Sequence, residues 1–164
     1  MPEFIVIAFS DEARALAAYE EVQLLEDRLV IEVGGVAFVH IDDNGKLRVE
    51  TPRSTTRLGS RAASSAVFGT VLGAVFFMPL IGLAAGGAVG ALFAGLDRTG
   101  IDDEFRKRVR NAVPDGHSAV VVYALRVKEQ AFEDALEAFG GEIHRATVSE
   151  SDEEELLREL TDLE

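Results

Sequence analysis

The sequence predicts an α+β fold, and two observations lead to that prediction. Strand and helix patterns follow one another as β-α-β and again as β-α-β, once a short return strand and a long insert are set aside. This order is typical of the ferredoxin-like split β-α-β arrangement, in which two helices pack on one face of an antiparallel sheet. The insert, residues 62–96, carries none of the charged side chains and holds seven of the 15 glycines. We therefore predict a split α+β domain with an inserted hydrophobic, glycine-rich helical hairpin.

The chain begins with a predicted strand and a predicted helix. "EFIVIAF", residues 3–9, is a short apolar run with β-branched residues, which indicates a buried strand. Ser10 offers an N-cap for the helix that follows, with Asp11 and Glu12 in its first turn. The inner face of this helix is marked by apolar residues at helical spacing: Ala15, Ala18, Tyr19, Val22, Leu25 and Leu29.

A second strand and a hairpin complete the first half. Residues 31–42 read as a strand, and Gly34-Gly35 within them indicates a bulge or a close approach. Asn44-Gly45 predicts a tight turn, because these two residue types supply the positive φ values that hairpin turns need. Residues 46–52 then return as an exposed strand.

The second half repeats the pattern after the insert. Residues 102–113 predict a short helix, and its Asp102, Asp103 and Glu104 suit the start of a helix better than a cation site. Residues 118–127 form the strongest strand pattern of the chain. A helix over 128–141, a strand over 142–149 and an acidic terminal helix complete the sequence. The strands that start at Glu3 and Ser118 are the most continuously apolar, so we expect them at the centre of the sheet.

The insert divides one domain into two parts. We expect residues 1–53 and 102–164 to form a discontinuous ferredoxin-like domain, and residues 54–101 to form a basic lead-in and the hairpin. If the strands before and after the insert pair in one sheet, a single membrane crossing would separate them. One helix over the insert would also be roughly 52 Å long, against about 30 Å of hydrocarbon. The insert should therefore fold back, with its turn at Pro79.

Small residues recur at four-residue steps on both arms of the predicted hairpin. They are Gly69 and Gly73 on the first arm, and Gly82, Gly86, Gly90 and Ala94, with Gly87, Ala91 and Gly95 beside them, on the second. Such strips let helix backbones approach closely, which replaces the missing hydrophobic drive between helices in lipid. We expect the strips to mediate homo-oligomerisation. Packing of the two arms of one hairpin against each other is the alternative.

Three arginines precede the first arm with no acidic residue among them. Arg53, Arg57 and Arg61 would share one face of a helix, which suits contact with anionic headgroups. An excess of Lys and Arg beside a hydrophobic segment also marks the cytoplasmic side of a membrane. The alternative is that these arginines are simply solvated.

Several quoted stretches together resemble a known family. They are "SDEARA", "GKLR", "GLAAGGAVGALFAGLDRTGIDDEF", "PDGHSAVVVYAL" and "FGGEIHRATVSE". With them the chain resembles the bacterial membrane-protein family catalogued as domain of unknown function twelve sixty-nine, over nearly its whole length. The resemblance implies a membrane-associated protein with no assigned enzymatic activity, and it implies no catalytic residues.

Composition and motifs narrow the function further. A net charge of −13 argues against a nucleic-acid partner, and the absence of cysteine excludes disulfides and thiolate chemistry. No glycine-rich loop ends in Lys-Ser or Lys-Thr, so no phosphate-binding motif is present, and we predict no cofactor. His40, His117 and Asp42 could lie together and hold zinc, although their spacing matches no known motif and we assign no metal. His144 should lie at the far edge of the sheet.

The sequence thus favours a non-enzymatic, membrane-associated protein that self-assembles through a glycine-zipper hairpin. Its soluble domain would face the cytoplasm at a bacterial inner membrane. One alternative is a soluble homo-oligomeric particle in the cytoplasm that encloses the hairpins. A small-molecule or metal sensor is a further alternative.

Overall fold

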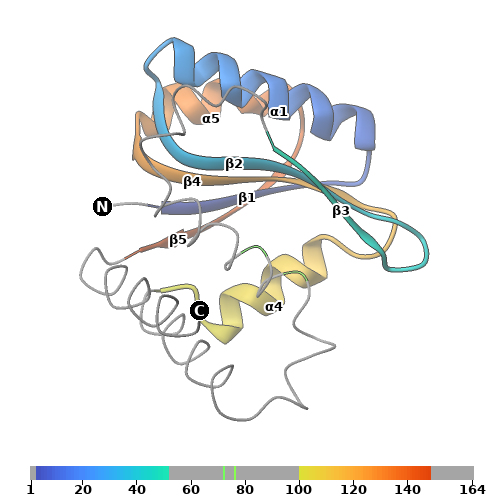
Figure 1. The fold of residues 1–164 in the computed structure, drawn as a ribbon. Helices are drawn as coiled ribbons and strands as arrows, with labels where there is room; N and C mark the ends of the chain where they lie inside the picture. Colours follow the sequence, from blue (N-terminus) through green and yellow to red (C-terminus); the bar gives the residue numbers. More distant parts are fainter. Residues whose placement is uncertain (1–2, 52–71, 73–75, 77–99, 149–164) are drawn as a thin grey trace.

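The computed structural model describes residues 3–51, 72, 76 and 100–148. This part of the chain contains a five-stranded antiparallel sheet and three helices (Figure 1). In chain order they are β1 (Glu3–Phe9), α1 (Glu12–Asp27), β2 (Ile31–Ile41), β3 (Leu47–Glu50), α4 (Asp103–Ala112), β4 (Ser118–Val127), α5 (Glu129–Glu137) and β5 (Glu142–Thr147). The predicted α+β class is confirmed, and the terminal helix predicted after Glu150 lies outside the described residues.

The strands are ordered β3-β2-β4-β1-β5, so the apolar strand β4 lies in the middle with β1 beside it, as predicted. In the register, Ile5 lies opposite Val122 of β4 and opposite Arg145 of β5. Strand β2 comes before the charge-free segment and β4 comes after it, and the two pair from Ile31–Val127 to His40–Ser118. The strands before and after the charge-free segment therefore belong to one sheet.

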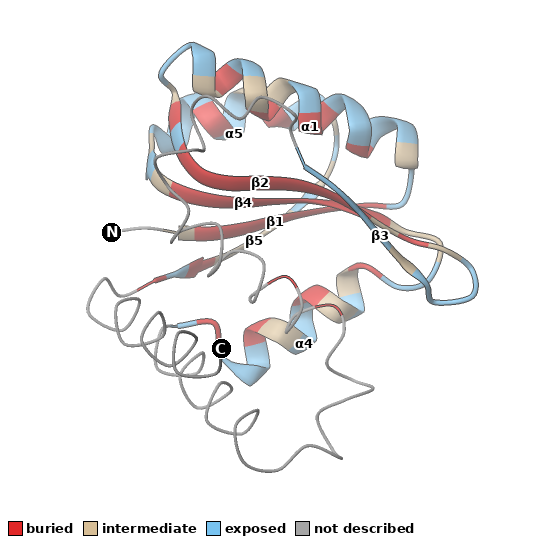
Figure 2. Cartoon of the chain, viewed as in Figure 1, coloured by how far each residue is buried: buried red, intermediate tan, exposed pale blue. Residues whose placement is uncertain are grey.

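Helices cover both faces of this sheet. In Figure 1, α1 and α5 lie over one face and α4 lies under the other. Alternate residues of each strand point to opposite faces, so each central strand supplies both cores. Figure 2 shows that β1, β2 and β4 are buried along most of their lengths.

The core under α1 and α5 is aliphatic and aromatic. Its fully buried members include Ile5, Phe38 and Val122 from the strands and Phe132 from α5. Tyr19 of α1 stacks on Phe38 with ring centroids 6.2 Å apart. The predicted inner face of α1 is confirmed except at its last member, Leu29.

Leu29 lies beyond the end of α1, with its side chain 78% exposed and a φ of 61°. The helix ends at Asp27, and the backbone N–H of Leu29 donates to the carbonyl of Glu26 in the turn that follows. A left-handed residue at this point reverses the chain and removes Leu29 from the apolar face.

The cap of α1 and the β2–β3 turn also differ from expectation. Asp11, not Ser10, is the N-cap, and its carboxylate accepts the backbone N–H of Ala13 at 2.9 Å. In the turn only Gly45 has a positive φ, at 81°. The Asp42 carboxylate accepts from the backbone N–H groups of Asn44 and Lys46, which stabilises a turn with one left-handed residue instead of two.

The glycine pair in β2 does mark a bulge. The register between β2 and β4 shifts between Glu32 and Gly35. A Cβ on Gly34 would lie 2.6 Å from the ring of Tyr123, so the ring occupies the space that a side chain would need. Gly34 is therefore a close-approach position, as the sequence indicated.

The environment of Tyr19 leads to a prediction about alkaline stability. Burial, and then the negative charge of Glu50, raise the pKa of Tyr19 to about 12 from its ordinary value of 10.0. The unfolded chain loses the phenol proton near pH 10 and the folded chain keeps it, so the free energy of unfolding should fall as pH rises from 10 towards 12. Urea unfolding across this range should show a steeper fall for the wild type than for Tyr19→Phe. Equal slopes would contradict the prediction.

Candidate functional site

The face of the sheet under α4 receives two residues of the charge-free segment. Leu72 and Phe76 have helical backbone conformation and are only 7% and 6% exposed. They belong to the hydrophobic cluster formed on this face by residues of all the central strands and α4: Phe4, Val6, Ala37, Val39, Val121, Tyr123, Phe105 and Val109. We call this cluster the α4-side core. Two apolar side chains of the segment, four residues apart in the sequence, thus pack against the sheet.

Helix α4 packs on the same face of the sheet. The Asp102 carboxylate caps the helix by accepting the backbone N–H of Phe105 at 2.8 Å, as expected for an acidic helix start. Phe105 and Val109 then point inward, and Phe105 meets Phe4 edge-on with centroids 6.3 Å apart. At its entrance, Gly100 has a φ of 101° and lies against the carbonyl of Thr147 in β5. The chain after the segment is therefore fixed to the edge of the sheet.

Truncation of Leu72 tests whether this anchor contributes to the domain. We expect Leu72→Ala to lower the free energy of unfolding by about 2–3 kcal/mol, because it removes buried methyl groups and leaves a cavity. The matched control is Leu24→Ala, since Leu24 is 45% exposed and its truncation should change stability by less than about 0.5 kcal/mol. Urea unfolding followed by far-UV circular dichroism measures both. Equal effects would show that Leu72 is not part of the core.

The site residues predicted from the sequence lie elsewhere. The glycines of the strips, the turn residue Pro79, and the arginines Arg53, Arg57 and Arg61 are all outside the described residues. Their roles stay predictions. Sequence reasoning missed Leu72, Phe76 and Gly100. In a segment where almost every residue is apolar or small, no periodicity distinguishes two anchors from their neighbours.

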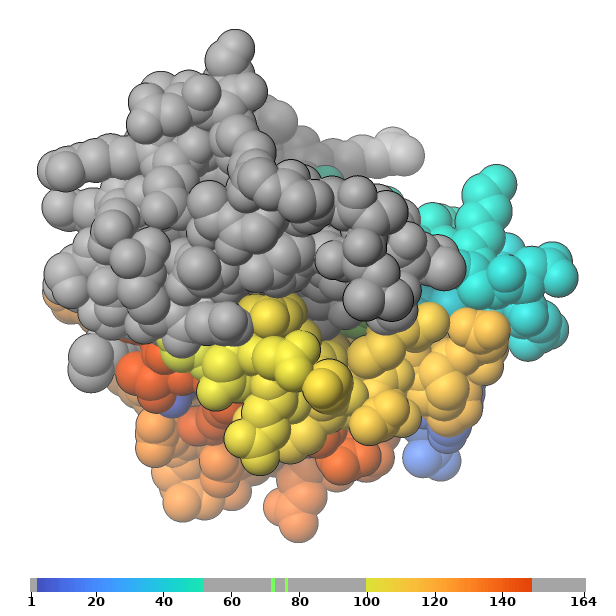
Figure 3. Space-filling model, turned by 90° about the horizontal axis from the view of Figure 1, so that it is seen from below, coloured from blue at the N-terminus to red at the C-terminus, as the bar shows by residue number. Residues whose placement is uncertain are grey.

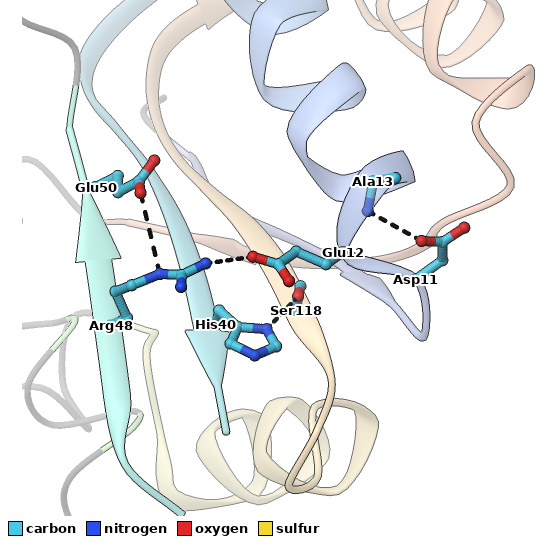
Figure 4. Close-up of polar contacts among 7 residues, drawn as sticks. All are labelled: Asp11, Glu12, Ala13, His40, Arg48, Glu50 and Ser118. Carbon is cyan, nitrogen blue, oxygen red and sulfur yellow. Dashed lines mark hydrogen bonds and ion pairs between the residues drawn. The ribbon is translucent and has the colours of Figure 1, made fainter. Parts of the chain in front are cut away.

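The alternative histidine site is only partly assembled. The backbone of Ile41 pairs with that of His117, and His40 lies opposite Ser118, so the two strand ends meet as predicted. His40 Nδ1 is hydrogen-bonded to Ser118 Oγ at 2.8 Å (Figure 4). Within residues 3–51 and 100–148, no three His, Asp or Glu side chains are placed to hold a metal ion. Because Ser118 is fully buried, its hydroxyl satisfies a core hydrogen bond and is inaccessible to a substrate.

A charged group lies next to this pair, where β3 meets the start of α1. Arg48 forms an ion pair with Glu12 and lies 4.0 Å from a carboxylate oxygen of Glu50 (Figure 4). Its guanidinium is also 6.0 Å from the centre of the Phe38 ring. These contacts hold the edge strand against the helix.

An open groove of about 530 Å³ lies between the end of α1 and strands β2 and β4. Its lining combines the apolar residues Leu29, Val30, Ile31 and Val127 with Glu26, Glu32, Arg126 and Lys128. His144 is far from this groove, on the edge strand β5 as predicted, with its Nε2 3.3 Å from Glu142. The groove therefore offers charged and apolar surface but no imidazole or hydroxyl for acid–base chemistry.

In the part of the chain that the structure describes, no helix is both long enough and apolar enough to cross a membrane. Nearly all of the charge-free segment lies outside that part.

Comparison with known families identifies the chain. The model of the family described as "Protein of unknown function (DUF1269)" matches residues 62–161, more than half of the sequence. The chain belongs to this family. The DUF1269 match begins where the charge-free segment begins and runs through α4, β4, α5 and β5. Neither the curated proteins nor the solved structures contain a significant match.

Proposed function

We propose that this DUF1269 protein is a non-enzymatic, self-assembling protein that associates with a membrane through residues 62–96. The observation that carries the proposal is a charge-free segment of 35 residues in a chain of net charge −13. Such a segment is stable only where lipid or protein removes it from water. Its partners would be the lipid bilayer and further copies of the same chain.

The sheet topology supports a hairpin in place of a single crossing. Strands β2 and β4 flank the segment in sequence and pair directly, so both ends of the segment start from one globule. The strand order β5-β1-β4-β2, with α1 and α5 over one face, supports the proposal that this globule contains a ferredoxin-like domain. On this proposal β3 and α4 are additions to that domain, and the segment is a helical hairpin inserted between them.

The cytoplasmic face of a bacterial inner membrane is the proposed location. Arg53, Arg57 and Arg61 precede the segment without an acidic residue among them. Positively charged residues near the ends of hydrophobic segments are retained on the cytoplasmic side. The soluble domain would lie on that side, and the arginines would contact anionic headgroups.

A second candidate is favoured by the anchor residues. Leu72 and Phe76 are buried against the sheet and α4, so these two side chains of the charge-free segment need no lipid to leave water. A soluble homo-oligomer could bury the remaining glycine-rich residues in the same way. Both candidates use the glycine strips as the contact between copies.

Fractionation of the full chain without detergent separates the two candidates. We expect the protein to sediment with membranes and to remain there after washes with high salt and alkaline carbonate, since buried apolar surface resists both. Recovery in the high-speed supernatant as a large particle by light scattering would reject the membrane and support the soluble oligomer. Recovery there as a monomer would reject both.

A further inference from the structure

Leu29 has a backbone conformation that usually belongs to glycine. The backbone N–H of Val30 donates to the carbonyl oxygen of Leu25 at 2.9 Å, and that of Leu29 donates to Glu26 at 3.0 Å. These are the two hydrogen bonds of a Schellman motif, whose left-handed residue is Leu29, with a φ of 61°. A side chain is strained in this conformation, and that of Leu29 is 78% exposed, the most among the large apolar side chains of the described residues. The domain therefore carries a strained leucine that it does not bury.

An apolar groove lies directly beside this leucine. Leu29 lines the open groove between the end of α1 and strands β2 and β4, together with the apolar residues Val30, Ile31 and Val127. The lining is held in place by the pairing of Ile31 with Val127 and by a 2.9 Å hydrogen bond from the N–H of Lys128 to the carbonyl oxygen of Val30. One patch of the surface thus holds both a projecting apolar side chain and a preformed apolar groove.

The charged residues around the groove balance one another. Two of them are acidic, Glu26 and Glu32, and two are basic, Arg126 and Lys128, although the whole chain has a net charge of −13. Arg126 lies 3.9 Å from Glu32, and its side chain is 88% exposed. Because both signs are present in equal number, two copies of this patch can meet without the net repulsion that two acidic surfaces would have.

The groove is on the α1 side of the sheet. Val30 and Val127 pack against the core under α1 and α5, whereas Leu72 and Phe76 pack on the opposite face with α4. Figure 3 shows α4, in yellow, at the surface of the molecule on the side away from α1 and α5. A partner at the groove therefore does not compete with the packing of residues 72 and 76.

We propose that the groove is a contact between two copies of the chain, in which Leu29 of each copy packs into the groove of the other. A two-fold contact uses the same patch on both copies, so that patch must carry both the projection and the groove. The inference rests on the proposed function, in which residues 62–96 bring copies together, and it adds a contact between their folded domains. Eight described residues line the groove, against about 20–30 on each side of a stable interface. The contact therefore forms only where the charge-free segments already hold the copies close.

Cysteine cross-linking of the full-length protein tests the contact. The chain has no cysteine, so Arg28→Cys gives a single thiol beside Leu29, and Ala13→Cys gives a matched exposed thiol near the other end of α1. The two positions are about 22 Å apart along the helix. The protein is treated with a short bis-maleimide in the environment, membrane or buffer, in which the wild type is recovered. We expect position 28 to be linked to position 28 of a second copy, with several-fold less dimer at position 13.

Variants of Leu29 test the role of its side chain. Leu29→Gly removes the projection, so cross-linking at position 28 should fall several-fold. Leu29→Met keeps an apolar side chain and should retain most of the cross-linking. Leu24→Ala is the control, because Leu24 is 45% exposed on the same helix and does not line the groove. It should leave cross-linking unchanged.

The same glycine substitution should stabilise a single copy. In the background of Gly86→Leu with Gly90→Leu, which we expect to be monomeric, Leu29→Gly should raise the midpoint of urea unfolding. Glycine adopts a positive φ without strain, and no buried contact is lost with the leucine side chain. A midpoint equal to or below that of the parent would mean that Leu29 stabilises its own domain, which would overturn the inference.

Lys128→Glu tests the charge balance. It leaves three acidic residues and one basic residue around each groove, so two copies should repel each other and cross-linking at position 28 should fall several-fold. Salt at about 1 M should restore it, since the screening length is then only about 3 Å. Lys107→Glu changes the net charge equally at an exposed site on α4 and should have no effect. Equal cross-linking in the two variants would overturn the role of the charges.

The possible failures are distinguishable. A protein recovered as a monomer would overturn both the proposed function and this inference. An assembled protein that is cross-linked equally at positions 28 and 13, or at neither, would overturn only the inference. Strong quenching of a fluorophore at position 28 by a nitroxide-labelled lipid, without cross-linking, would assign Leu29 to the bilayer instead of a second copy. Cross-linking that persists in Leu29→Gly would overturn the role of the leucine.

Discussion

Gly100→Ala should lower the free energy of unfolding by about 4 kcal/mol or more, an effect large enough to unfold much of the protein. Two costs add at this position. Its φ of 101° is strained for any residue with a side chain, and a Cβ would overlap the carbonyl oxygen of Thr147. Neither backbone segment can move freely, because Gly100 enters the capped helix α4 and Thr147 is paired with Glu3. The midpoint of urea unfolding measures the loss.

Gly45→Ala is the matched control. Gly45 has a similar conformation, with a φ of 81°, but the nearest atoms to a Cβ there are those of the Asp115 side chain at 3.7 Å. The control therefore keeps the backbone strain, about 1–2 kcal/mol, and lacks the overlap. A loss of the same size in both variants would mean that the approach of Gly100 to β5 is unimportant.

The two central strands could be located from the sequence because polar or turn-forming residues bound each apolar run. Residues 3–9 and 118–127 are strands with the predicted bounds, since each is a continuous apolar run that ends at polar or turn residues. The prediction that they lie centrally also holds, because only a strand covered on both faces can be apolar at every position.

Helix ends were predicted less well. Ser10 and Asp11 are both good N-caps, and the choice between them depends on where the strand before them stops pairing. Leu29 continues the apolar spacing of α1, but the chain must turn before β2, and the turn takes Leu29 out of the core. The spacing of apolar residues does not show where the chain must turn to reach β2.

The α4-side core could not be predicted because its members come from distant parts of the chain. Helix α4 has only two buried residues, Phe105 and Val109, which leaves much of this sheet face to other residues. Leu72 and Phe76 contribute to it, although their surroundings in sequence indicate a membrane or an oligomer interface. A segment that is apolar throughout can be buried against a sheet, in a bilayer or against another copy of the chain. Its sequence alone does not select among these three environments.

Replacing Gly86 and Gly90 together with leucine should abolish self-assembly and leave the sheet domain folded. On the helix predicted from their spacing, the two glycines lie on one strip, and leucine side chains there would hold neighbouring backbones apart. We expect light scattering of the variant, in detergent or in buffer according to where the wild type is recovered, to give the mass of a monomer. The urea midpoint should stay that of the wild type, because the domain is held by β2–β4 pairing and its two cores.

A control for added bulk comes from the same arm. Ala85→Leu with Leu92→Phe adds side-chain volume on the side of the predicted helix away from both glycine strips, so assembly should persist. If both double variants dissociate, any added volume disrupts the segment and the strips have no special role. If neither does, the glycines pack the arms of one hairpin or serve no contact. Because the two pairs differ mainly in their position around the helix, dissociation of the glycine variant alone would locate the interface on the strip.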